Sequence, residues 1–178
     1  MRSNSKQKYL FLDIDGVMNH EQWLHLAHKR NLSSPEFWFD PVCVDRLNRI
    51  LTETGTKLVI SSSWRSDPKL SEQFQQVGIH SDFDRTISMD QSRKLGYTIR
   101  GEEIDHYLEE HGVDIHSKHQ YVILDDDNDF TPWQRQNTLF RTAATPFDEP
   151  YKRNAGTGLT EDLTEQIIKY LSYESKRH

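Results

Sequence analysis

Short apolar runs recur along the chain, separated by longer stretches in which apolar and polar residues mix. The first run covers residues 9–14 and ends at Asp15-Gly16, the second covers 57–61, and the third covers 121–124. Short apolar runs bounded by polar or turn-forming residues are typical of buried strands. The pattern therefore predicts three strands, and a weaker run near residues 138–142 indicates another.

The mixed stretches predict helices with recognisable ends. Asp40 followed by Pro41 is typical of an N-cap and a first helical position, and Gly55 marks the end of that helix. Further helices are expected over residues 68–77, from Thr98 to near Gly112, and from Thr160 onward.

Other segments have weaker patterns. Residues 17–40 carry several aromatic residues and histidines but no capped, periodic helix, so we expect a loop or a small flap there. Residues 79–97 favour neither a helix nor a strand. The last residues, 174–178, are expected to be frayed.

The alternation of strands and helices predicts the fold class. Strands that are apolar throughout indicate a parallel sheet with helices on both faces, so we expect an α/β fold, a Rossmann-like three-layer α/β/α arrangement around about five parallel strands. A chain of 178 residues fits one domain, 1–178. The interval before the second strand leaves room for a flap and for no large cap domain. Ligands of such sheets bind beyond the carboxyl ends of the strands.

Composition limits the functional classes. The formal charge of −6 argues against a protein that stably coats nucleic acid, although a nucleic-acid end could still be a substrate. No apolar stretch approaches the length of a membrane span, and residues 1–8 lack the apolar core of a signal peptide, so we expect a cytoplasmic protein. A single cysteine excludes a disulfide within one chain. The chain also lacks the GxxxxGK[ST], HExxH, GxSxG and GxGxxG patterns.

Two carboxylates lie at the end of the first predicted strand. Asp13 and Asp15 are two positions apart, so in an extended segment both side chains face the same side. A carboxylate can attack phosphorus once a cation screens the charge of the phosphate, and a second carboxyl can protonate the leaving oxygen. The alternative interpretation is a simple turn after a strand.

A cluster of acids follows the third predicted strand. Asp125, Asp126, Asp127 and Asp129 lie within five consecutive positions, and packed carboxylates repel one another unless a cation holds them. A calcium loop would require glycine and glutamate where this chain has Phe130 and Gln136. Magnesium suits the pattern, since it needs few protein carboxylates.

Candidate phosphate ligands come from two further places. Three serines, Ser61 to Ser63, follow the second predicted strand, where hydroxyl and backbone N–H groups could bind phosphate oxygens, although serines there can also be turn formers. Arg100 stands near the start of a predicted helix, which is unfavourable for a cation unless an anion lies nearby. A surface ion pair with Glu102 or Glu103 is the alternative for Arg100.

These motifs, in this order, resemble the haloacid dehalogenase (HAD) superfamily of phosphatases. The resemblance implies that Asp13 in FLDIDGV is the nucleophile and Asp15 the acid/base. It implies a Mg²⁺ ion held by Asp13, Asp15 through its backbone carbonyl, Asp125 and Asp126. In KLVISSSWR it assigns phosphate binding to Ser62, with Ser61 as the alternative. Arg100 is similar to the cation of the third motif, for which Lys94 and Arg93 compete.

Within the superfamily, the chain looks most like the small phosphatase domains of RNA-repair proteins, and TIRGEEIDHYL is similar to a segment of phage polynucleotide kinase-phosphatases. The resemblance implies a magnesium-dependent phosphomonoester hydrolase with an aspartyl-phosphate intermediate. Its expected partner is a phosphorylated substrate, either a nucleic-acid 3′-phosphate end or a nucleotide. A small-metabolite phosphatase, a non-catalytic phosphate sensor and a degenerate interaction domain are the alternatives; a receiver domain would place its acid pair after the first strand.

Overall fold

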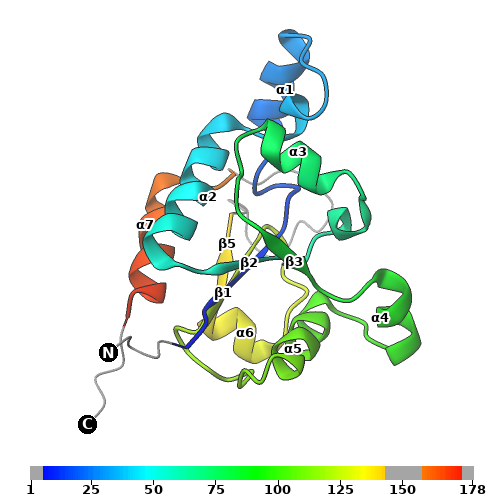
Figure 1. The fold of residues 1–178 in the computed structure, drawn as a ribbon, viewed down its shortest axis with the longest axis vertical. Coiled ribbons are helices and arrows are strands. Elements are labelled where there is room, and N and C mark those ends of the chain that lie inside the picture. Colours follow the sequence, from blue (N-terminus) through cyan, green and yellow to red (C-terminus); the bar gives the residue numbers. More distant parts are fainter. Residues whose placement is uncertain (1–5, 143–157, 174–178) are drawn as a thin grey trace.

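A five-stranded parallel sheet forms the centre of the protein in the computed structural model, which describes residues 6–142 and 158–173 (Figure 1). The strand order is β3-β2-β1-β4-β5, so β1 is central and pairs with both β2 and β4. The strands are β1 (Tyr9–Leu12), β2 (Lys57–Ile60), β3 (Phe83–Arg85), β4 (Tyr121–Asp125) and β5 (Leu139–Arg141).

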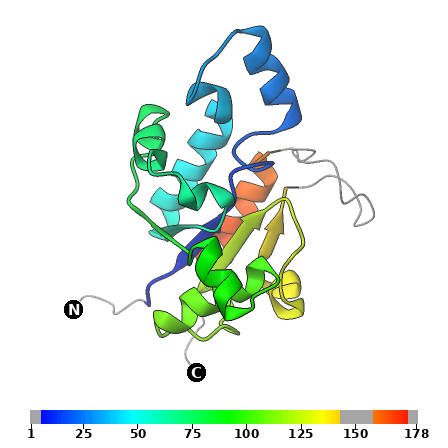
Figure 2. The same ribbon diagram turned by 90° about the vertical axis from the view of Figure 1, so that its right-hand side faces the viewer.

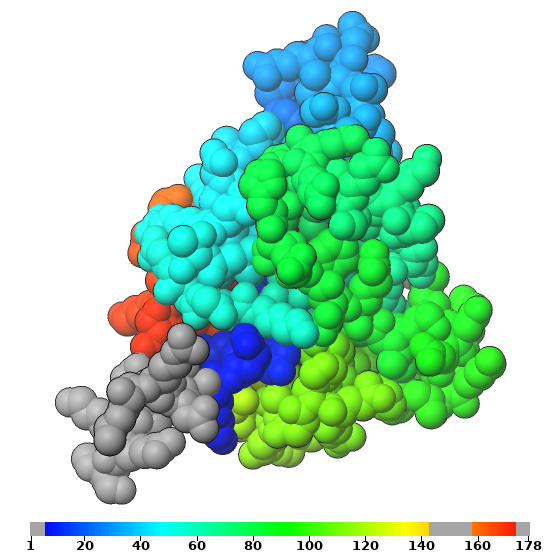
Figure 3. All heavy atoms as spheres, viewed as in Figure 1, coloured from blue at the N-terminus to red at the C-terminus, as the bar shows by residue number. Residues whose placement is uncertain are grey.

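Helices connect the strands and cover both faces of the sheet. They are α1 (Glu21–Lys29), α2 (Pro41–Thr54), α3 (Leu70–Gln76), α4 (Met89–Leu95), α5 (Arg100–Glu110), α6 (Pro132–Asn137) and α7 (Glu161–Leu171), with short 3-10 turns η1 (Glu36–Trp38) and η2 (Ser63–Ser66). Helices α1 and α4 project from the body of the molecule at two different places (Figures 1 and 3).

Side chains alternate between two apolar layers along each central strand. On β1, Leu10 and Leu12 pack with α2, α3 and α7, whereas Phe11 packs with α5 and α6 on the other face. Figures 1 and 2 show α5 and α6 next to each other on one side of the sheet. Both faces of the central strands are therefore buried, which explains why these strands are apolar at every position.

The predicted three-layer α/β/α fold is confirmed, and the described residues contain no large cap domain. Some element boundaries differ from the predictions. The first strand ends at Leu12, so Asp13 and Asp15 lie in the turn after it. The residue at the N-cap of α5 is Ile99 and not Thr98. The Glu102 carboxylate accepts hydrogen bonds from the backbone N–H groups of Thr98 and Ile99, so this side chain, and not the Thr98 hydroxyl, binds the backbone at the start of the helix.

Residues 17–40 contain more regular structure than the sequence indicates. Helix α1 begins after His20, whose Nδ1 accepts a hydrogen bond from the Trp23 backbone N–H, and it buries only Trp23 and Ala27. The Trp23 indole N–H donates to the Phe37 carbonyl, so α1 packs against η1 as a small helical flap. Residues 79–97 form β3 and α4. The predicted frayed tail, 174–178, lies outside the described residues.

Among residues 6–142 and 158–173, no helix has both the length and the apolar character that crossing a membrane requires.

Candidate active site

The three central strands deliver their polar residues to one edge of the sheet. Leu12 pairs in register with Ile60 on β2 and with Leu124 on β4. The next residue of each segment is Asp13, Ser61 or Asp125, and these three therefore lie in one row. The convergence follows from parallel strands of equal register, as the sequence predicts.

Arg100 reaches this row from the start of α5. Its Nη1 lies 3.0 Å from Asp13 Oδ1 and 2.5 Å from Asp125 Oδ2. The Asp129 carboxylate accepts a hydrogen bond from the Arg100 backbone N–H at 3.3 Å, which fixes the start of the helix. Burial lowers the pKa of Arg100, whereas the neighbouring carboxylates of Asp125 and Asp13 raise it. The effect of the carboxylates is the larger one, so the pKa is raised and the guanidinium stays protonated.

The other two candidate cations lie elsewhere. Arg93 and Lys94 are exposed on α4, where Arg93 pairs with Asp90 on the surface. Of the three cations that the sequence offers for the phosphate, Arg100 is the one that the structure brings to Asp13.

The two candidate serines differ in their surroundings. Hydrogen bonding by the Ser62 side chain offsets part of the rise in the pKa of Asp13 that burial causes, and the Ser62 hydroxyl oxygen accepts a hydrogen bond from the Trp64 backbone N–H at 3.3 Å. Ser61 Oγ is buried without a hydrogen-bond partner among the residues described. The Ser62 hydroxyl thus acts on the ionisation of Asp13 and caps the η2 turn, whereas the Ser61 hydroxyl has no hydrogen-bond partner among the described residues.

Both oxygens of the Asp15 carboxylate are held. The Trp64 indole N–H donates to Oδ2 at 3.0 Å, and Asn19 Nδ2 donates to Oδ1 at 3.1 Å. Asn19 also accepts a hydrogen bond from the Gly16 backbone N–H, so the whole turn is tied together. Neither Trp64 nor Asn19 is predicted from the sequence as a site residue; the only local signal is that Trp64 directly follows the serines.

Three carboxylates form a compact group beside Arg100. One oxygen each from Asp13, Asp125 and Asp126 lies within 4.8 Å of the others. Burial raises the pKa of Asp13 to about 6, and burial together with neighbouring carboxylates raises the pKa of Asp125 and of Asp126 to about 7. The Arg100 guanidinium contacts two of these carboxylates, Asp13 and Asp125. The group offers only oxygen donors, which fit a hard divalent cation such as Mg²⁺.

Gly16 makes room for Asp126. Its backbone has φ +78°, and a Cβ at this position would lie 2.2 Å from Asp126 Oδ2. The turn after β1 therefore requires glycine both for its conformation and for the close approach of the acid from the end of β4.

The remaining acids of the cluster have other partners. Asp127 is exposed, and its backbone N–H donates to Asp125 Oδ1 at 2.9 Å. Asp129 holds the start of α5 through Arg100. The four acids of LDDDND therefore differ in their surroundings: Asp125 and Asp126 lie beside Asp13, Asp127 is exposed, and Asp129 binds the start of α5.

The parallel sheet with its carboxylates beyond β1 and β4 defines a protein of the HAD superfamily. A family model described as the HAD domain in Swiss Army Knife RNA repair proteins matches residues 9–148, and the chain belongs to this family. Membership supports a phosphatase-like function of the HAD type. A search of curated proteins finds no match.

Proposed function

We propose that this protein is a magnesium-dependent phosphomonoester hydrolase that forms an aspartyl-phosphate on Asp13. The observation that carries the proposal is the environment of Asp13. Its buried carboxylate lies beside Arg100, Ser62 and two further acids, while Asp15 is held nearby by two hydrogen bonds.

In the proposed first step, a carboxylate oxygen of Asp13 attacks the phosphorus atom and the bond to the leaving oxygen breaks. Asp15 donates its proton to that leaving oxygen. In the second step Asp15 takes a proton from water, the water oxygen attacks phosphorus, and the bond between phosphorus and Asp13 breaks. Inorganic phosphate is released and both aspartates return to their starting states.

Arg100 and Ser62 would stabilise the non-bridging phosphate oxygens during both steps. Arg100 is charged and partly buried, where an electrostatic interaction is stronger than in water. The Ser62 side chain favours the ionised form of Asp13, and its hydroxyl would donate to a second oxygen.

The carboxylates of Asp13, Asp125 and Asp126, with the backbone carbonyl of Asp15, would hold Mg²⁺. The ion would screen the charge between Asp13 and the phosphate and polarise the phosphoryl oxygens.

For the substrate we propose a 3′-phosphate at a nucleic-acid end, in a cytoplasmic setting. The family description names RNA repair, and the described residues include only a small helical flap and no large cap over the strand ends. A small phosphorylated metabolite is the competing substrate, and the net charge of −6 favours it.

Hydrolysis of a generic aryl phosphate, with and without Mg²⁺, tests the mechanism. We expect Asp13→Asn to lower kcat by about a thousandfold or more, because the amide cannot act as the nucleophile. Asp127→Asn is the matched control, since this exposed acid lies in the same loop as the other acids and should leave the rate unchanged. Equal rates for Asp13→Asn and the wild type would refute the mechanism.

A panel of 3′-phosphorylated oligonucleotides, mononucleotides and sugar phosphates then tests the substrate. The proposal requires the highest kcat/KM for oligonucleotide ends. A preference for sugar phosphates would remove the nucleic-acid assignment and leave the mechanism in place.

A further inference from the structure

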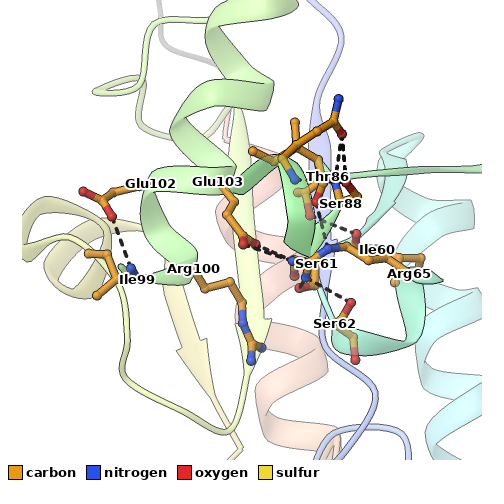
Figure 4. Close-up of polar contacts among 12 residues, drawn as sticks. Ile60, Ser61, Ser62, Arg65, Thr86, Ser88, Ile99, Arg100, Glu102 and Glu103 are labelled. Carbon is orange, nitrogen blue, oxygen red and sulfur yellow. Dashed lines mark hydrogen bonds and ion pairs between the residues drawn. The ribbon is translucent and has the colours of Figure 1, made fainter. Parts of the chain in front are cut away.

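Arg65 is a buried cation that the proposed reaction does not use. Only 8% of the residue is exposed. Its Nη1 donates to the backbone carbonyls of Ser61 at 2.8 Å and Ser62 at 3.2 Å, and its Nε donates to the Ile87 carbonyl at 2.9 Å. Figure 4 shows the side chain lying between these serines and Glu103.

Glu103 is the ionic partner of Arg65. The Arg65 Nη2 lies 3.0 Å from the Glu103 carboxylate, and Glu103 is itself only 8% exposed. Burial lowers the pKa of Arg65, whereas the charge of Glu103 raises it. Each charge is therefore compensated inside the protein by the other.

The ion pair connects the two elements that carry the candidate phosphate ligands. Arg65 belongs to η2, which begins directly after Ser62, whereas Glu103 stands on α5 one helical turn after Arg100. On a helix, residues three positions apart lie on the same face, so the position of Glu103 constrains that of Arg100. Arg65 also binds the segment after β3, because its Nε donates a hydrogen bond to the Ile87 carbonyl.

A buried ion pair is weak evidence of stabilisation, because desolvation of the two charges offsets much of their attraction. It is a specific orienting device, however, since the planar guanidinium with its fixed donors fits one arrangement of acceptors. Lysine could keep the charge but could not satisfy two serine carbonyls, the Ile87 carbonyl and Glu103 at once.

We propose that Arg65 is a positioning residue that, together with Glu103, sets the Ser62 hydroxyl at a fixed distance from Arg100 so that both meet the same phosphate. The inference rests on the phosphate site of the proposed function. It goes beyond that function by assigning a task to two residues that have no part in the proposed chemical steps.

The test is the affinity for inorganic phosphate in the presence of Mg²⁺, measured by calorimetry, with Tm measured in parallel. We expect Arg65→Lys and Glu103→Gln each to weaken phosphate binding by about tenfold, by analogy with the loss of metal affinity when a group that orients a metal ligand is removed. Because the two residues act as a unit, the double variant should weaken binding little more than either single variant.

Tyr107→Phe is the matched control for a merely structural role. The Tyr107 hydroxyl donates to Asp84 at 2.7 Å and so ties α5 to β3 at a place remote from Arg100. We expect this variant to lower Tm and to leave the phosphate affinity unchanged. An equal loss of affinity in Tyr107→Phe would overturn the inference, as would Arg65→Lys or Glu103→Gln with wild-type affinity.

Two further outcomes are decisive. If Arg65→Lys does not fold, the nearly isosteric Glu103→Gln carries the test alone. A wild-type protein that binds no phosphate overturns the inference, whereas one that binds phosphate but hydrolyses no ester refutes only the proposed function.

Discussion

Trp64 combines a polar and an apolar contact at the candidate site. Its indole N–H donates to Asp15 Oδ2, while its ring packs edge-on against Trp38 and Phe39. The packing holds the ring in place, so the hydrogen bond has a defined direction. Trp64 therefore belongs both to the core and to the site.

Trp64→Phe should separate the two contacts. Phenylalanine keeps most of the packing but cannot donate to Asp15, so we expect kcat for an aryl phosphate to fall about tenfold, with little change in KM. Steady-state kinetics measure both parameters. Trp133→Phe, on α6, is the control and should behave as the wild type; a Trp64→Phe kcat within about twofold of the wild-type value would show that the bond is dispensable.

Gly16→Ala should act on the metal site through Asp126. The new Cβ would overlap the Asp126 carboxylate, so we expect Mg²⁺ affinity, measured by calorimetry, to fall by about tenfold or more. Gly112→Ala provides the control, since Gly112 also has a positive φ but a Cβ added there would meet no atom within 4 Å. Both variants should lose about 1 kcal/mol of stability from backbone strain. Equal Mg²⁺ affinities in the two variants would contradict the role assigned to Gly16.

At the scale of elements, helix α5 carries a partly buried carboxyl group, and the ionisation of this group above mildly acidic pH lowers the stability of the folded protein. Burial raises the pKa of Asp105 to about 6, and its carboxylate accepts a hydrogen bond from Gln134 on α6 at 2.7 Å. The folded protein therefore binds this proton more tightly than the unfolded chain, whose pKa is about 3.9. The stability that this tighter proton binding contributes is fully present below the pKa that Asp105 has in the unfolded chain. It is lost as the pH rises through the pKa of about 6 that Asp105 has in the folded protein.

Asp105→Asn should remove this pH dependence. The amide oxygen can still accept from Gln134, so we expect the free energy of unfolding to rise by about 1–2 kcal/mol at about pH 8 and to change little near pH 4. Urea unfolding at both values measures the difference from the wild type. Glu72→Gln, at an exposed position of α3, should show no such pattern. A gain in Asp105→Asn that is equal at both pH values would contradict the assignment.

The elements that the sequence predicts well are those with strong local signals. Helix α2 has an N-cap, a proline and a closing glycine in the expected places. In contrast, β3 is an edge strand without a fully buried residue, and α4 buries only Ser92, so neither has an apolar pattern. The N-cap of helix α1 is His20, and histidine is an unusual residue at that position.

The same distinction applies to the site. Asp13 and Asp125 could be placed together from sequence because parallel strands bring their carboxyl ends to one edge. The choice of Arg100 over other cations depends on the path of the chain between β3 and α5. Trp64 and Arg65 act through partners distant in sequence, Asp15 and Glu103. No local pattern encodes such pairs.

At the scale of the whole molecule, a net charge of −6 is combined with a buried concentration of carboxylates at one edge of the sheet. Arg100 offsets part of this local charge. The folded protein should therefore gain stability from a bound divalent cation, since the unfolded chain has no comparable site.

Mg²⁺ should raise Tm more at about pH 8 than at about pH 5.5. The pKa of Asp125 and that of Asp126 are about 7, so at the lower pH the metal must displace protons that are absent at the higher one. Thermal unfolding with Mg²⁺ or with chelator measures the increment. Asp125→Asn should abolish it and Asp127→Asn should retain it; equal increments at the two pH values would argue against these carboxylates as ligands.

The central strand β1 has to wait for its neighbours while the chain is being synthesised. The strand is synthesised first, but its partner β4 and the acids that follow come more than one hundred residues later. At ordinary rates of translation, roughly 6–23 seconds separate Asp13 from Asp126. Throughout that interval one edge of β1 lacks its neighbour and is open to pairing with other chains. Completion of the central sheet and assembly of the candidate site are thus the same late event.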